Sequence, residues 1–197
     1  MSKNSDDWLD RWLATISRAS SGATILELGC GEGRDTQRLH DAGIKVVGID
    51  RSRDAIHAAV RRNLGCSFVV GDIRSDLPND GAEYPVVLAS LCLHYFSWKE
   101  TIEAVERIHV SLADGGLLLA RVNSTRDVNY GAVGHPEIET NYYDVRGRAK
   151  RFFDERALKA VFAANKWNVV LREENEIHRY EKPKFVWEVA LTKVAPN

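Results

Sequence analysis

The stretch from Glu27 to Gly33, which reads Glu-Leu-Gly-Cys-Gly-Glu-Gly, constrains this chain most. It follows a short apolar run at 23–28 and precedes a stretch with helical spacing that ends near Gly43. Glycines at every second position allow a tight turn and let a ligand approach the backbone closely. The free N–H groups at the start of the following helix add donors at the same place. The motif therefore predicts a nucleotide-type site at a strand–turn–helix junction.

The same order of strand and helix repeats along the chain. Further short apolar runs predict strands at 45–49, 67–70, 86–89 and 116–120. Because these runs are almost continuously apolar, we expect strands that are buried on both faces, as in parallel sheets covered by helices. Two last strands are expected near 167–171 and 185–192, and the second should pair antiparallel. The predicted fold class is α/β, with a doubly wound, mostly parallel seven-stranded sheet and an antiparallel last strand.

Several of the helices between these strands have a recognisable start or apolar face. An amphipathic helix is expected in residues 1–20, and another near 154–158. Ser52 can cap one helix, and Ser97 with Glu100 has the spacing of a capping box at the start of another. The predicted inward faces are Trp8, Leu9, Trp12, Leu13 and Ile16 in the first helix, Ile56, Ala59, Val60 and Leu64 after Ser52, and Ile102, Val105, Ile108 and Leu112 after Ser97.

The size and composition suit one globular domain over residues 1–197. The net charge is −1, whereas nucleic-acid binders usually carry a basic excess, so no nucleic-acid partner is expected. No run reaches about 18 apolar residues and no signal peptide is recognisable, so no membrane association is expected. The cysteines, Cys30, Cys66 and Cys92, lack metal-ligand spacing. We therefore expect no metal site, reduced thiols and a cytoplasmic location.

Acidic residues stand where successive predicted strands end. Asp50 closes the second strand about 20 positions after Gly29, which suits two ribose hydroxyls. Asp72 ends the third strand, and Glu27 lies at the end of the first. The alternative is that Asp50 only caps the next helix and that Asp72 is an ordinary turn residue. Because ligands of open α/β sheets bind at the carboxyl ends of the strands, the joint placement indicates one crevice.

The spacing Glu-x-Gly-x-Gly-x-Gly resembles the first motif of class I methyltransferases. The dinucleotide fingerprint would instead need Gly or Ala where Arg34 stands. The resemblance implies a Rossmann-like methyltransferase fold that binds S-adenosylmethionine, with Asp72 at the adenine amine and Ile73 packed on its ring. The implied cofactor-binding residues are Glu27, Gly29, Cys30, Gly31, Gly33, Asp50, Arg51, Asp72, Ile73 and Ser90.

Three segments resemble small bacterial methyltransferases of the tellurite-resistance type: 29–36, 93–96 and 179–188. The fourth strand lacks both the Asp/Asn-Pro-Pro-Tyr motif of DNA amino-methyltransferases and the Pro-Cys nucleophile of cytosine enzymes, which favours a small-molecule acceptor. His94 and Tyr95 follow that strand and are the candidate catalytic residues. His94 could act as a general base or orient the acceptor, or it could be a structural histidine bonded to the backbone. Tyr95 is expected mainly as a pocket wall.

Residues 123–151 are polar, aromatic and aperiodic, and a long stretch without secondary structure is usually functional. Since it follows the fifth strand, we expect it to cover the acceptor. A run of cations, in which Arg146, Arg148, Lys150 and Arg151 take part, suggests a small anionic acceptor, although it could be a solvated basic face. The predicted substrate-binding residues are Arg126, Tyr130, Tyr142 and Arg146, and the segment 178–180 could reach the same pocket.

Two other functions remain open at this point. One is a non-catalytic module that binds S-adenosylmethionine, and the other is an NAD-dependent oxidoreductase, which Arg34 disfavours. The acceptor, the methylated atom, the need for a base and the oligomeric state are left open by the sequence.

Overall fold

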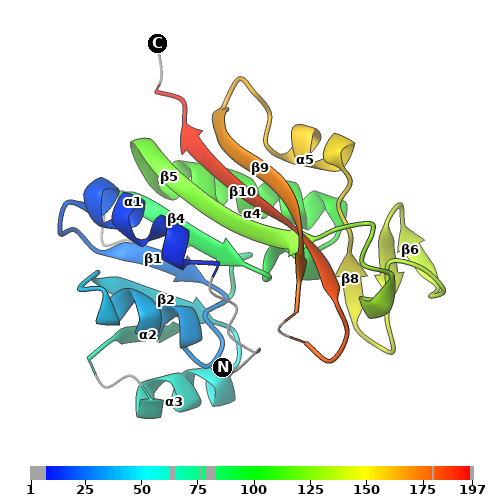
Figure 1. Ribbon diagram of the computed structural model, residues 1–197, viewed down its shortest axis with the longest axis horizontal. Coiled ribbons are helices and arrows are strands. Elements are labelled where there is room, and N and C mark those ends of the chain that lie inside the picture. The colour runs from blue at the N-terminus through cyan, green and yellow to red at the C-terminus, as the bar shows by residue number, and fades with distance from the viewer. Residues whose placement is uncertain (1–7, 63–64, 76, 79–82, 179, 196–197) are drawn as a thin grey trace.

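A seven-stranded sheet forms the centre of the molecule in a computed structural model that describes residues 8–62, 65–75, 77–78, 83–178 and 180–195 (Figure 1). The strand order is β3-β2-β1-β4-β5-β10-β9. The strands are β1 Ile25–Leu28, β2 Val46–Asp50, β3 Ser67–Val70, β4 Tyr84–Ser90, β5 Leu112–Asn123, β9 Trp167–Ile177 and β10 Lys184–Lys193.

The pairing confirms the predicted α/β fold. Strands β3, β2, β1, β4 and β5 run parallel to one another, and β10 runs antiparallel to both β5 and β9. The last strand therefore lies inside the sheet, and β9 forms the edge. The chain first builds outward from β1 to β3 and then returns to β4, so β1 and β4 flank the point where the strand order reverses.

Helices cover the two faces of the sheet and divide the core into two clusters. The helices are α1 Asp10–Ser20, α2 Arg34–Asp41, α3 Arg53–Arg62, α4 Trp98–Ser111 and α5 Glu155–Val161. On one face α1 packs through Trp12 and Ile16. On the other face α4 packs through Val105 and Ile108, next to α5 with Leu158. Among the described helices none is both long and apolar enough to span a membrane.

The capping residues work as predicted, but two apolar faces differ. Ser97 accepts a hydrogen bond from the Glu100 N–H, and the Glu100 side chain accepts one from the Ser97 N–H, which completes the capping box. Val60 is 46% exposed and Ile102 is 37% exposed, so their predicted inward positions are wrong. Each stands at the border of its helix face, where spacing alone does not distinguish core from surface. Leu112 is buried, but it begins β5 rather than ending a helix.

Two other expectations change, one at the edge of the sheet and one at the start of the first helix. Strand β3 is largely exposed, because it lies at the sheet edge with no strand beyond it. The first helix begins at Asp10, after a turn at Trp8 and Leu9, whereas residues 1–7 of the predicted helix lie outside the described residues. Leu64 and Arg179 also lie outside them.

The segment 123–151 is ordered, which corrects the expectation of a structureless loop. It contains a short helical turn, η2 Val128–Tyr130, and an antiparallel sheet of β6 Glu137–Glu139, β7 Tyr142–Asp144 and β8 Ala149–Arg151. These strands are too short to show an alternating pattern in the sequence. The small sheet lies to one side of the main sheet, beyond the ends of β9 and β10 in Figure 1. We call the segment the acceptor-side segment.

Candidate active site

The glycine loop after β1 is held in a conformation that other residues rarely adopt. Gly29 has φ +64° and Gly31 has φ +55°, both in the left-handed region. A Cβ atom on Gly29 would lie 2.4 Å from the Cβ atom of Cys92, whereas one on Gly31 would meet open space. Gly33 is the N-cap of α2. The motif thus serves two needs: a close approach to the chain after β4, and an open cradle at Gly31.

Two cavities, of about 760 and 330 Å³, lie at the carboxyl ends of the parallel strands. They share Gly29 and Leu91 in their walls, so they adjoin at the middle of the crevice. The wall of the larger cavity includes Asp50, Arg51, Asp72, Ile73 and Tyr95. The wall of the smaller cavity includes Glu27, Cys30, Gly31 and Ser90. Every predicted cofactor-binding residue except Gly33 therefore lines one of the two cavities.

Asp50 connects the end of β2 to the glycine loop. Its Oδ2 atom accepts a hydrogen bond from the Gly31 N–H at 2.9 Å, and its Oδ1 atom accepts one from the Ser52 N–H at 2.8 Å. A carboxylate can accept about four hydrogen bonds, so two positions remain for hydroxyl groups of a ligand. The residue that caps α3 is Ser52 rather than Asp50, because the Ser52 hydroxyl accepts a hydrogen bond from the Ala55 N–H.

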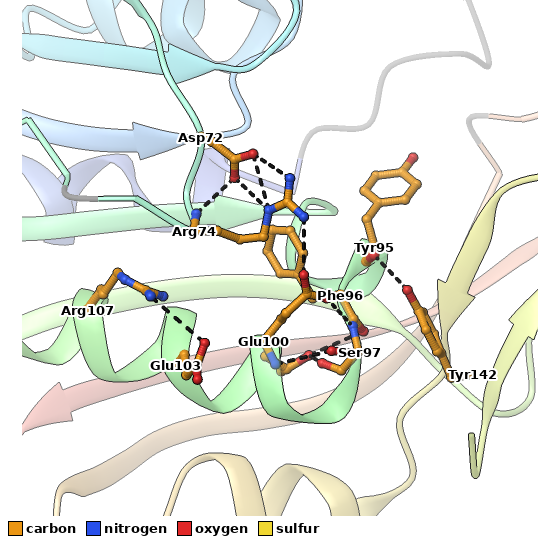
Figure 2. A network of polar contacts seen from close by, with 10 residues as sticks. Asp72, Arg74, Tyr95, Phe96, Ser97, Glu100, Glu103, Arg107 and Tyr142 are labelled. Atoms are coloured by element: carbon orange, nitrogen blue, oxygen red, sulfur yellow. Dashed lines mark hydrogen bonds and ion pairs between the residues drawn. The ribbon is translucent and has the colours of Figure 1, made fainter. Parts of the chain in front are cut away.

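Asp72 takes part in a network that ties the end of β3 to the start of α4 (Figure 2). Arg74 donates to both carboxylate oxygens of Asp72, with the shortest contact at 2.6 Å, and to Glu100 at 3.1 Å. The guanidinium of Arg74 holds the pKa of the Asp72 carboxyl below its ordinary value. Asp72 also accepts a hydrogen bond from the Arg74 N–H, so it does act as a turn residue. Because Asp72 also lines the larger cavity, its contact with the adenine amine remains a prediction.

Glu27 is a buried carboxyl group in the wall of the smaller cavity. The Thr36 hydroxyl donates to it at 2.5 Å. Burial raises the pKa of Glu27 to about 8, and the nearby charges of Asp35 and Asp50 act in the same direction. Burial disfavours the charged form of a carboxyl group unless a cation compensates it. The smaller cavity therefore suits a ligand group that carries positive charge.

Two residues that line the smaller cavity, Leu91 and Arg121, carry no signal in the sequence. Leu91 has φ +55°, an unusual conformation for a leucine, and strained backbone of this kind clusters at functional sites. Arg121 is buried at the end of β5, donates to the Ser90 hydroxyl at 3.0 Å and lies 4.3 Å from the Trp8 ring. Trp8 in turn donates to Asp35 at 3.1 Å. The turn before α1 thus contacts two residues that line the smaller cavity, Arg121 and Asp35, which the residue types did not reveal.

The candidate catalytic residues lie in a short helical turn, η1 Leu93–Tyr95, directly after β4. His94 is 4% exposed, and among the described residues its Nδ1 atom has no hydrogen-bond partner. Burial lowers the pKa of His94 well below its ordinary value, and the charges of Lys184 and Lys150 lower it further. The ring of Tyr95 lies 4.2 Å from that of His94, is 47% exposed and lines the larger cavity. His94 is therefore a neutral imidazole beside the site.

Tyr142 lies where the acceptor-side segment meets η1, but its hydroxyl is already bonded. It donates to the Tyr95 carbonyl at 3.1 Å, as Figure 2 shows. Arg151 donates to the Phe96 carbonyl at 3.1 Å and pairs with Glu139, and its guanidinium lies 4.8 Å from the Tyr142 ring. Together these contacts anchor the small sheet to the turn that carries the catalytic candidates.

The structure does not bring the other predicted substrate residues into the two cavities. Arg126 pairs with Glu174 at 2.9 Å. The hydroxyl of Tyr130 donates to the Lys182 carbonyl at 3.1 Å. Arg146 is exposed at the hairpin tip, and the residues after it, Gly147, Arg148 and Ala149, line the larger cavity instead. Tyr180, from the segment 178–180, lines the smaller cavity. Sequence position alone could not separate Arg146 from Arg148.

The cysteines are placed as ordinary thiols. Cys30, Cys66 and Cys92 are free, and burial raises the pKa of the Cys92 thiol. A protonated thiol is a poor nucleophile, so Cys92 does not resemble the cysteine of a cytosine enzyme. Within the described ranges, no group of three His, Cys, Asp or Glu residues could hold a metal ion.

Residues 25–116, which contain the glycine loop and the strands up to β4, match the family of the methyltransferase domain. This part of the chain is similar to S-adenosylmethionine-dependent methyltransferase domains. This similarity supports the predicted cofactor, S-adenosylmethionine, and agrees with the strand order and the acidic crevice. It does not favour the oxidoreductase or the non-catalytic module.

Similar sequences and structures support the methyltransferase domain. A trans-aconitate 2-methyltransferase of Paracidovorax citrulli is 29% identical over 109 residues, which are 54% of this chain and 41% of that protein. An uncharacterised methyltransferase of Synechocystis is 32% identical over 111 residues, which are 56% of this chain and 51% of that protein. The matched part thus spans about half or less of these relatives.

Solved structures confirm the fold beyond the matched region. A methyltransferase from Methanosarcina mazei has a TM-score of 0.74 at 17% identity, over 88% of this chain and 93% of that chain. A 1,6-didemethyltoxoflavin-N1-methyltransferase of Burkholderia thailandensis, solved with 1,6-didemethyltoxoflavin and S-adenosylhomocysteine, has a TM-score of 0.70 at 21% identity, over 96% of this chain and 82% of that chain. The β9–β10 pair therefore belongs to the same fold as the parallel strands.

Proposed function

We propose that this protein transfers the methyl group of S-adenosylmethionine to a small-molecule acceptor. The observation that carries the proposal is the pair of adjoining cavities at the carboxyl ends of the strands, whose walls combine acidic residues with Tyr95 and Arg148. A site that only binds the cofactor would not need a second group of aromatic and cationic residues there.

The residues present fit the cofactor in charge and in shape. S-adenosylmethionine supplies a methyl group on a positively charged sulfur, and it carries an amino group that is also positive. In our assignment Asp50 binds the ribose hydroxyls, and Asp72 and Ile73 hold the adenine in the larger cavity. We assign Glu27 to the amino acid part of the cofactor, because a nearby cation would stabilise the ionised form of its buried carboxyl group. Gly31 leaves the loop open for that approach.

On the acceptor side we assign an aligning role to His94 and Tyr95. Orientation of two reactants alone can contribute effective molarities of about 10⁵–10⁸ M. The exposed ring of Tyr95 forms part of the wall of the larger cavity. A neutral His94 can accept a proton from an acceptor that must lose one, whereas an acceptor that is already anionic needs no base.

Several finer assignments belong to the same proposal. A small acceptor is supported by the ordered acceptor-side segment next to the larger cavity and by the small-molecule methyltransferases among the relatives and structural neighbours. From the sequence features we also propose a relationship to methyltransferases of the tellurite-resistance type. We further propose a single domain over 1–197 and a cytoplasmic location. Arg126, Tyr130 and Arg146 remain predicted acceptor residues, with Arg148 as a better placed cation.

The proposal is tested by conversion of S-adenosylmethionine to S-adenosylhomocysteine in the presence of fractionated small metabolites, with RNA, DNA and protein fractions in parallel. We expect turnover with a metabolite fraction, and loss of that turnover in Asp50→Ala. Binding of S-adenosylhomocysteine, measured by calorimetry, is the independent control. If the protein binds neither cofactor form at saturation, or if only a macromolecular fraction supports turnover, the proposal is wrong.

A further inference from the structure

On the basis of the proposed function, we infer that the acceptor carries a carboxylate-type anion, which binds between the ammonium groups of Lys150 and Lys184. The two lysines come from distant parts of the chain: Lys150 lies in β8 of the acceptor-side segment, and Lys184 begins β10. Sequence position gave Lys184 no role in the site, because it follows a turn far from the glycine loop.

Lys184 is a buried cation with a partner and with aromatic neighbours. Its side chain is 8% exposed, and its Nζ atom lies 2.8 Å from the Oδ2 atom of Asp127, which is fully buried. The rings of Tyr130 and Tyr180 lie 5.1 and 5.9 Å from the same Nζ atom. Burial of a charge is costly unless it is paired, and Asp127 provides that pairing for one lysine.

Lys150 adds a second positive charge, whereas Asp127 supplies only one negative charge for the two lysines. Because side chains alternate along a strand, Lys150 lies on the face of β8 opposite to Arg151, the residue that anchors the small sheet. Within the part of the chain that the structure describes, the Lys150 ammonium forms no hydrogen bond or ion pair. Lys150 is half-buried, and its burial lowers its pKa below the ordinary value. One negative charge thus faces two lysines.

Two buried polar side chains lie beside these lysines without partners. Among the described residues the Nδ1 atom of His94 and both side-chain polar atoms of Asn123 form no hydrogen bond. Lys184 and Lys150 are the charges that act on His94. Asn123 is paired with Val186, two residues after Lys184, so Asn123 and Lys184 share a face of the sheet. Buried polar groups nearly always have partners, so these two point to a polar ligand.

A carboxylate matches this group of residues in charge and in hydrogen bonding. It would offset the excess positive charge and would accept hydrogen bonds from the Lys150 and Lys184 ammonium groups and from the Asn123 amide. Neutral His94 can donate through Nδ1 in one of its two tautomers. The group adjoins the smaller cavity, because Tyr180, whose ring lies 5.9 Å from the Lys184 Nζ atom, lines it.

The test uses matched small molecules that differ only in charge: benzoate with benzamide, and succinate with succinamide. They are titrated into the full chain saturated with S-adenosylhomocysteine, and binding is followed by calorimetry and by ligand-observed NMR. We expect the carboxylates to bind more tightly than the amides. Lys150→Gln should weaken carboxylate binding about ten- to hundredfold, as expected for a lost charged hydrogen bond. Lys150→Arg should retain binding.

Matched controls separate this site from the fold and from the cofactor site. Lys45→Gln removes an exposed lysine that directly precedes β2 and lines a different cavity, and it should change nothing. The double variant Lys184→Gln with Asp127→Asn removes the buried pair without leaving a lone charge, and it should also weaken carboxylate binding. Since this variant could lose its fold, Lys150→Gln carries the decision.

The outcomes distinguish the two proposals. If S-adenosylhomocysteine does not bind to the unaltered protein, the proposed function is wrong. If it binds, but no carboxylate binds, or amides bind equally well, or Lys150→Gln binds carboxylates as tightly as the unaltered protein, the carboxylate site is wrong and the proposed function stands.

Discussion

The carboxylate of Asp50 holds the glycine loop by accepting the Gly31 N–H at 2.9 Å. Strand β2 therefore positions the loop that follows β1, although 19 residues separate the two groups. One side chain thus has two tasks: it fixes the loop, and it offers its remaining lone pairs to the cavity. The first task makes the second precise, because a ligand hydroxyl then meets a carboxylate that is already oriented.

We expect Asp50→Ala to weaken binding of S-adenosylhomocysteine by roughly ten- to hundredfold, since a hydrogen bond to a charged group contributes about 1.5–3 kcal/mol. Calorimetric titration measures the affinity, and circular dichroism verifies the fold. Asp54→Ala removes an exposed carboxylate in the first turn of α3 and is the matched control. Unchanged affinity in a folded Asp50→Ala protein would show that Asp50 does not hold the ribose.

Gly29 and Gly31 should respond differently to alanine. Gly31→Ala should cost about 1–2 kcal/mol of stability from the left-handed backbone alone, because its Cβ would meet open space. Gly29→Ala should cost more, because its Cβ would also overlap the Cβ of Cys92. Denaturant unfolding measures both. Adding Cys92→Gly to Gly29→Ala should recover part of the loss, and equal stabilities of the two single variants would contradict the predicted contact.

Glu27 should make the stability of the cofactor-free protein depend on pH. Its pKa is about 8 in the fold and near 4.5 when unfolded, so the folded state binds the proton more tightly between these values. The stability contribution is therefore full below about pH 4.5 and is lost as the pH rises towards 8. Unfolding free energies of the unaltered protein and of Glu27→Gln should diverge over this range, with Glu27→Gln the more stable at pH 8. A constant difference would contradict the raised pKa.

Cofactor binding should reverse that shift, because the positive charge of S-adenosylmethionine favours ionised Glu27. We expect proton release on binding at pH 7, measured by calorimetry in buffers of different ionisation enthalpy. Glu27→Gln should release fewer protons. Equal release by both proteins would place the cofactor's charge elsewhere.

Arg151→Met should loosen the acceptor-side segment from η1. It removes the bonds to the Phe96 and Thr140 carbonyls and the pair with Glu139. We expect a loss of at least about 1.5–3 kcal/mol in denaturant unfolding. Hydrogen exchange should rise in 137–151 more than in the main sheet. Arg156→Met, at an exposed position of α5, is the control. If exchange rises equally in both variants, Arg151 is not the anchor.

The residues that line the two cavities around the glycine loop were largely predictable, because their determinants are local in the sequence. Gly29 and Gly31 take left-handed backbone angles that favour glycine, and Asp50 and Asp72 stand at strand ends. The acceptor side was less predictable. The expected loop proved to be a small sheet of three-residue strands, and Arg126 is engaged by Glu174. A side chain's partner across strands is not encoded near it in the sequence.

The sequence by itself determined the α/β order, the glycine loop and the acidic crevice, because hydrophobic period, glycine conformation and strand ends are properties of short segments. Only the tertiary structure decided how the cations of the acceptor-side segment and of β10 are placed. It buried Lys184 beside Asp127 and placed Lys150 within electrostatic reach of His94. The physical reason is that burial and charge pairing arise between β5, β8 and β10, whose residues meet only when the chain has folded.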